Sequence, residues 1–128
     1  MAKFIYTIIG GILLVAVATT VLAIFPNNDG LLGLDVIFHL MGGAFVAWCG
    51  YLLNRRLTII WLVVAIMSVG WELAEYLSLV FGPTYWPAAV PYYYSGGLVD
   101  SLADLVVDGF GALVFILLYC RYDQNQSN

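Results

Sequence analysis

The segment Leu98–Cys120, LVDSLADLVVDGFGALVFILLYC, decides the fold, because it is apolar enough to cross a bilayer and yet contains three carboxylates. These are Asp100, Asp104 and Asp108, and their four-residue spacing places them in one narrow stripe of a helix. An acid at the centre of a membrane helix costs about 2.5–3.5 kcal/mol, whereas each large apolar residue returns only about 0.3–0.6 kcal/mol. The stripe must therefore face protein, water, protons or a metal.

The composition is that of an integral membrane protein. The chain of 128 residues is 63% hydrophobic and has only four Lys plus Arg against eight Asp plus Glu. Long apolar runs at this content indicate membrane spans rather than a soluble domain. The sequence offers no basic patch for nucleic acid. Cys49 and Cys120 lie in apolar segments without zinc-type spacing, so we expect reduced, buried thiols and no disulfide.

We expect an all-α fold, a four-helix transmembrane bundle that forms one domain over residues 1–128. The predicted spans are at about 4–25, 31–53, 57–81 and 98–119, and the connection at 82–97 is a predicted outer loop. Three prolines argue against a regular helix through that loop. The first span is longer than the roughly 7–15 apolar residues of a secretory signal, so we predict that it is retained.

The cations predict the orientation of the bundle. With four spans, Lys3, Arg55, Arg56 and Arg121 all fall on one side of the membrane. Because positively charged residues favour the cytoplasmic side, both termini are predicted to be cytoplasmic. We therefore expect a multi-pass protein of a bacterial or archaeal cytoplasmic membrane, with the lipid bilayer as its main partner.

Ionisable residues of the last three predicted spans fall in one layer beneath the outer face. At about 1.5 Å rise per residue, they lie roughly 3–15 Å below the outer ends of their helices. They are Asp35, His39, Glu72, Glu75, Asp100, Asp104 and Asp108. No Lys or Arg shares the layer, so we predict a binding cavity that opens to the outer face. The alternative is that these groups only join three helices by hydrogen bonds.

Three conditions would stabilise this layer. The carboxylates could share protons, or an aqueous cleft could solvate them. A divalent cation could bind instead: His39, Glu72 and Asp104 would suit zinc, manganese or iron, while carboxylates alone would suit calcium or magnesium. In any hydrolytic chemistry His39 or Glu72 would be the base, although the sequence does not decide whether the chain is an enzyme. No Glu-x-x-His occurs, which argues against a di-metal oxidase.

Small residues continue the faces that carry these polar groups. Gly42 or Gly43 and then Gly50 follow His39 along its helix, and such residues let a neighbouring helix approach closely. In the first span Gly10 and Gly11 offer a similar surface. These Gly/Ala faces could serve packing within the chain, self-association or contact with other membrane subunits.

Three short motifs on the last three spans share the order and spacing of a known family. They are Asp35-x-x-x-His39, Glu72-x-x-Glu75 and Asp104-x-x-x-Asp108-x-x-Gly111. Together, over about residues 31–119, they resemble the VanZ-like family of small bacterial membrane proteins. With Trp71 before Glu72, the chain is similar to a branch of uncharacterised members. The resemblance implies an envelope location and a link to low-level resistance to teicoplanin, an antibiotic that acts outside the membrane; it implies no defined reaction.

The chain departs from the family pattern in a consistent direction. Glu75 stands where VanZ-like proteins usually have Gln, and Asp108 where they have Asn. The Arg that usually precedes the last helix is missing, and Phe115 replaces a second Gly. The site is therefore more acidic than the family pattern, which favours a cation or shared protons over an anionic ligand.

Three functions remain open from the sequence. The first is a VanZ-like envelope protein whose cavity binds a divalent cation or a cationic or polyol lipid head group. The second is a small accessory subunit of a larger membrane complex, which would purify as a stoichiometric member of that complex. The third is a proton or cation transport protomer, which would give a measurable flux in liposomes.

Overall fold

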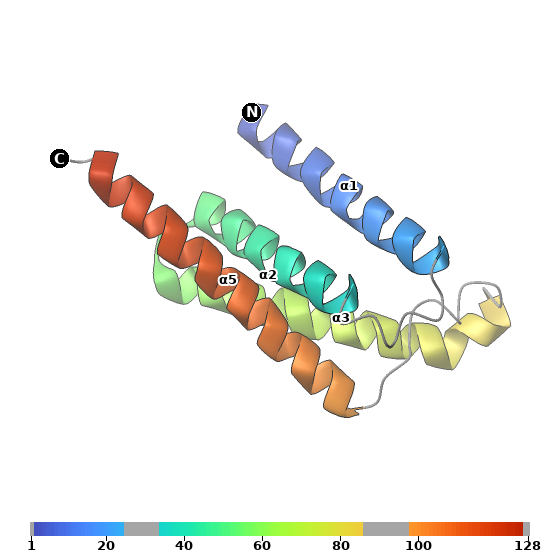
Figure 1. Cartoon of the computed structure of the whole chain (residues 1–128). Helices are drawn as coiled ribbons and strands as arrows, with labels where there is room; N and C mark the ends of the chain where they lie inside the picture. Colours follow the sequence, from blue (N-terminus) through green and yellow to red (C-terminus); the bar gives the residue numbers. More distant parts are fainter. Residues whose placement is uncertain (1, 25–33, 86–97, 127–128) are drawn as a thin grey trace.

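Four helices make up nearly all of the part of the chain that the structure describes. The structure, a computed structural model, describes residues 2–24, 34–85 and 98–126 (Figure 1). The helices are α1 (Ala2–Ile24), α2 (Leu34–Leu53), α3 (Leu57–Tyr85) and α5 (Leu98–Gln126). The described residues contain no strand, so the predicted all-α four-helix fold is confirmed.

Three of the helices are long and apolar enough to cross a membrane. The qualifying stretches are Asp35–Leu53 in α2, Leu57–Ser78 in α3 and Leu98–Tyr119 in α5, with mean hydropathies of 1.7, 2.0 and 2.0. Helix α1 is 23 residues long and coincides with the predicted first span. Its stretch Ile9–Ala18 is apolar, and a crossing by this fourth helix stays a prediction.

Two helices continue beyond the predicted span ends. Helix α3 runs to Tyr85, so the predicted loop at 82–97 is wrong for its first four residues. Pro83 removes one backbone hydrogen bond and disfavours the helix there, yet the long apolar helix before it continues for two more residues. Helix α5 runs to Gln126 because no Gly or Pro follows residue 119 to end it. Residues 86–97 of the predicted loop, and 31–33 of the second predicted span, lie outside the described part.

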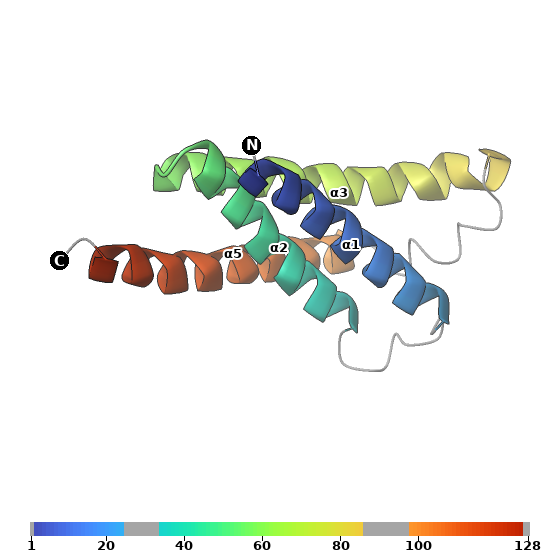
Figure 2. The same cartoon turned by 90° about the horizontal axis from the view of Figure 1, so that it is seen from above.

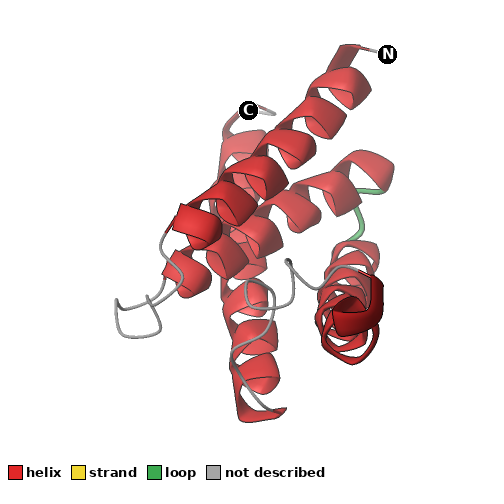
Figure 3. Cartoon of the chain, turned by 90° about the vertical axis from the view of Figure 1, so that its right-hand side faces the viewer, coloured by secondary structure: helices red, strands yellow, loops and turns green. Residues whose placement is uncertain are grey.

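Helix α2 is central to the bundle. It contacts each of the other three helices, and it packs most extensively against α5, which it crosses in Figure 2. Helix α1 runs alongside α2 in every view and contacts the bundle mainly through it (Figure 3). The N-terminal end of α1, the C-terminal end of α5 and the α2–α3 connection lie toward one end of the bundle (Figure 1). This arrangement agrees with termini on one side, and the side itself stays a prediction.

The buried core has an apolar half and a polar half. The apolar half lies nearer the α2–α3 connection and consists of Ala47, Ile60, Val64, Ala112 and Ile116. Farther along the same helix faces the buried residues become polar; they are His39, Ser68, Asp104 and Asp108. The outward faces carry many exposed large apolar side chains, which suit contact with lipid rather than water.

Two glycines allow α2 and α5 to touch backbone to backbone. A Cβ atom added at Gly43 would lie only 2.7 Å from the Cα atom of Asp108. A Cβ atom added at Gly111 would lie 2.9 Å from the carbonyl carbon of Leu40. Because Gly43 follows His39 by one helical turn, this contact places the Asp108 side chain within reach of the imidazole. The predicted role of the small residues on the His39 face is therefore confirmed.

Candidate functional site

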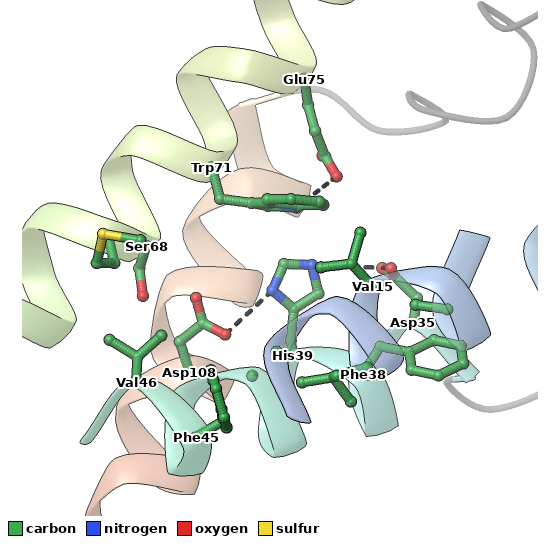
Figure 4. Close-up of a pocket in the computed structure, with 15 residues that line it drawn as sticks. Val15, Asp35, Phe38, His39, Phe45, Val46, Ser68, Trp71, Glu75 and Asp108 are labelled. Atoms are coloured by element: carbon green, nitrogen blue, oxygen red, sulfur yellow. Dashed lines mark hydrogen bonds and ion pairs between the residues drawn. The ribbon is translucent and has the colours of Figure 1, made fainter. Parts of the chain in front are cut away.

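His39 is the centre of the polar half of the core. The residue is buried, and its Nδ1 atom lies 3.2 Å from Oδ1 of Asp108, at hydrogen-bond distance (Figure 4). Its Nε2 atom lies 3.7 Å from Oδ1 of Asp35 and 3.7 Å from Oδ2 of Asp104. Both ring nitrogens therefore face carboxylates. We call Asp35, His39, Asp104 and Asp108 the His39 cluster.

The cluster leads from an exposed residue to buried ones. Asp35 lies in the first turn of α2, and its side chain is 52% exposed. Asp104 and Asp108 lie one turn apart on α5, and their side chains are only 7% and 9% exposed. A cation or proton that enters beside Asp35 would thus meet Nε2 of the imidazole together with Asp104, whereas Asp108 lies at the other ring nitrogen.

Three members of the His39 cluster could hold a metal ion. Ligand atoms of Asp35, His39 and Asp104 lie within 4.8 Å of one another. One imidazole with two carboxylates is a donor set that suits zinc, manganese or iron. The predicted triad contained Glu72 in place of Asp35, and Glu72 is not part of this group.

Glu72 nevertheless lies at a polar position of the interior. Its Oε1 atom is buried and has no hydrogen-bond partner among the described residues. A buried acceptor without a partner costs about 1–3 kcal/mol, more when it is charged. Glu72 therefore keeps its place among the candidate site residues, because its buried oxygen requires a hydrogen-bond donor and not because it contacts His39.

Glu75 is held by Trp71, an aromatic residue whose pairing with Glu75 was not predicted from the sequence. The indole Nε1–H of Trp71 donates a hydrogen bond of 2.7 Å to Oε1 of Glu75 (Figure 4). The two residues are four apart on α3, and this spacing is the signal that would have paired them. Asp100, the seventh predicted site residue, is exposed in the first turn of α5 and lies outside the metal-ligand group.

A pocket of about 310 Å³ adjoins the His39 cluster. Residues of α1, α2 and α3 form most of its wall, and most of them are apolar. The polar lining consists of Asp35, His39, Ser68, Glu75 and Asp108, together with the Trp71 indole (Figure 4). The sequence did not predict the contribution of α1, because that helix carries no acidic residue and no histidine.

The chemistry of this site has to be inferred from its own residues. No family model, no curated protein and no solved structure matches this chain.

Proposed function

We propose that the chain is a VanZ-like multi-pass protein of the cell envelope that binds a cation, or the head group of an envelope lipid, at the His39 cluster. The observation that carries this proposal is the convergence of three carboxylates from two helices on one buried imidazole beside a pocket. Three aspartates exceed the single positive charge that His39 can supply, and no Lys or Arg lines the pocket. An electropositive ligand would supply the missing charge.

The motifs behind the family resemblance support the proposal as a group. Asp35 and His39 come from the first motif, and Asp104 and Asp108 from the third. These four residues meet in space, and Gly111 of the third motif allows the helices to approach. Residues that are scattered over the sequence thus act as one structural unit, as expected for a shared binding site.

The position of the cluster supports access from outside the cell. His39 and Asp104 lie in the N-terminal halves of α2 and α5, whereas Arg55 and Arg56 follow the opposite end of α2. The positive-inside rule places the arginines in the cytoplasm and the cluster in the outer leaflet. The exposed carboxylate of Asp35 then forms the entrance from that side.

A cation-binding assay tests the proposed function. Purified protein in detergent is equilibrated with Mn²⁺ or Zn²⁺, or titrated with ethylammonium, and the bound cation is measured per chain by metal analysis or calorimetry. We expect saturable binding of at least one of these cations to the wild type. Asp104→Asn should weaken cation binding about tenfold or more, because the cluster loses a charged carboxylate ligand.

Asp100→Asn is the matched control, since it removes the same charge one turn away at an exposed position. It should leave the affinity within about threefold of the wild type, as a screened surface charge does. Binding that is absent for all three cations, or that Asp104→Asn and Asp100→Asn affect equally, would refute the proposal.

A further inference from the structure

The pocket beside the His39 cluster is larger than a lone cation requires. Its volume of about 310 Å³ lies at the lower end of the range of about 300–1,000 Å³ for small-molecule sites. Along α2 its lining extends from Asp35 to Val46, roughly 16 Å at 1.5 Å per residue. The polar groups of α2 lie at the start of this stretch, and Phe45 and Val46 lie at its end. Apolar side chains lie beside the polar groups, with Val15 next to the His39–Asp35 pair and Val46 next to Asp108, so the pocket combines a polar cluster with apolar walls (Figure 4).

Helix α1 supplies an apolar wall of the pocket. Leu14, Val15 and Ala18 line the pocket from α1, and Met67 lines it from α3. Helix α1 is supported on α2 where Phe45 packs against Gly11, whose added Cβ atom would lie 3.0 Å from the Phe45 ring. The pocket thus lies between helices, and its walls have the chemistry of hydrocarbon.

The charges define the head group that such a pocket would accept. An ammonium group has three N–H donors and one positive charge, which fit carboxylate oxygens converging from several directions. A phosphate or carboxylate head would face Asp35, Asp108 and Glu75. His39, the one lining side chain that can carry a positive charge, already faces three carboxylates. Like charges brought together in this way are strongly unfavourable.

We propose that the pocket binds a single-chain amphiphile with a cationic amine head group. The ammonium group of the ligand lies at the His39 cluster, and its hydrocarbon chain lies between α1, α2 and α3. One chain fits the volume at the lower end of the ligand range better than two. This inference rests on the proposed function and names the ligand class of the same site.

The test locates the hydrocarbon chain of the ligand and does not measure its affinity. A hydrocarbon chain gains little free energy on moving from lipid to an equally apolar pocket, so its affinity would be uninformative. The protein is placed in phosphatidylcholine nanodiscs with a long-chain primary amine that carries a photoreactive diazirine in mid-chain. A fatty acid with the same chain and diazirine is the matched probe of opposite head charge. Cross-linked residues are identified by peptide mass spectrometry after illumination.

We expect the amine probe to label Leu14, Phe45 and Val46, which line the pocket and are only partly exposed, and unlabelled long-chain amine to compete. The fatty-acid probe should label these residues about tenfold less, because its head is repelled from the cluster. Both probes should label lipid-facing residues such as Leu117 and Leu118, which are exposed on α5. This comparison uses the wild-type chain and does not depend on any variant folding.

Two tryptophan variants add a steric control. Ala18→Trp should lower amine labelling of Phe45 and Val46 about fivefold or more by filling the pocket from α1. Leu118→Trp adds the same bulk on the lipid face and should leave pocket labelling unchanged. Equal labelling of the pocket by both probes, or by neither, would overturn the ligand class. If ethylammonium or Mn²⁺ still binds the wild type in that case, the proposed function stands and only the amphiphile is refuted.

Discussion

Gly111→Ala is expected to destabilise the bundle by about 1–3 kcal/mol, although it adds a single methyl group. At this position the new Cβ atom would meet the backbone of α2, with the Leu40 carbonyl carbon at 2.9 Å and the Ala44 nitrogen at 3.0 Å. Backbone atoms cannot rotate away as a flexible side chain can. The helices would therefore have to separate, and the contact between His39 and Asp108 would lengthen with them.

Gly109→Ala is the matched control on the same helix. An added Cβ atom at Gly109 meets nothing within 4 Å. Replacing a helical glycine by alanine without a clash stabilises the helix by about 0.5–1 kcal/mol. The two variants, two residues apart, should thus shift stability in opposite directions. Unfolding in detergent, followed by helical circular dichroism during a titration with SDS, measures both; equal stabilities would contradict the close α2–α5 packing.

The elements of the fold could be predicted because their signals are strong and local. Long apolar runs interrupted by Asn54–Arg56 are sufficient to place α2 and α3, and those helices begin or end within a few residues of the prediction. The ends of α3 and α5 were less predictable, because a proline in a last turn and a polar tail both remain compatible with helix. The side-by-side arrangement of α1 and α2 depends on the fit of Phe45 to Gly11, which no periodicity reveals.

The positions of the candidate site residues along their helices could be predicted, but the rotation of each helix about its own axis could not. Four-residue spacing places Asp35 with His39 and Asp104 with Asp108, and these pairs meet as expected. Whether Glu72 or Asp35 joins His39 and Asp104 as a metal ligand depends on how far α3 is turned about its axis. Depth calculations contain no such angle, so the predicted triad and the observed group differ in that one residue.

His39 and Asp108 are expected to be strongly coupled in stability, whereas His39 and Asp35 are not. The Asp108 side chain is 9% exposed and lies 3.2 Å from the imidazole, so removing either partner leaves the other buried without it. Removing one partner of a buried ion pair costs about 3–5 kcal/mol, and contacting residues couple by about 0.5–3 kcal/mol. We expect a coupling energy of about 1.5 kcal/mol or more for this pair. The Asp35 pair, which is half exposed, should give only about 0.2–1 kcal/mol.

Two double-mutant cycles that share the His39→Ala variant measure this difference in coupling energy. The first combines His39→Ala with Asp108→Ala, and the second combines His39→Ala with Asp35→Ala, all in the same SDS titration. Neutral hydrogen bonds between membrane helices average only about 0.6 kcal/mol in such cycles. A coupling well above that value for Asp108 would mean that the imidazole carries a charge that the buried carboxylate stabilises. Couplings of about 0.6 kcal/mol in both cycles would instead indicate neutral hydrogen bonds, and the polar half of the core would then be hydrogen-bonded packing without the excess negative charge on which cation binding depends.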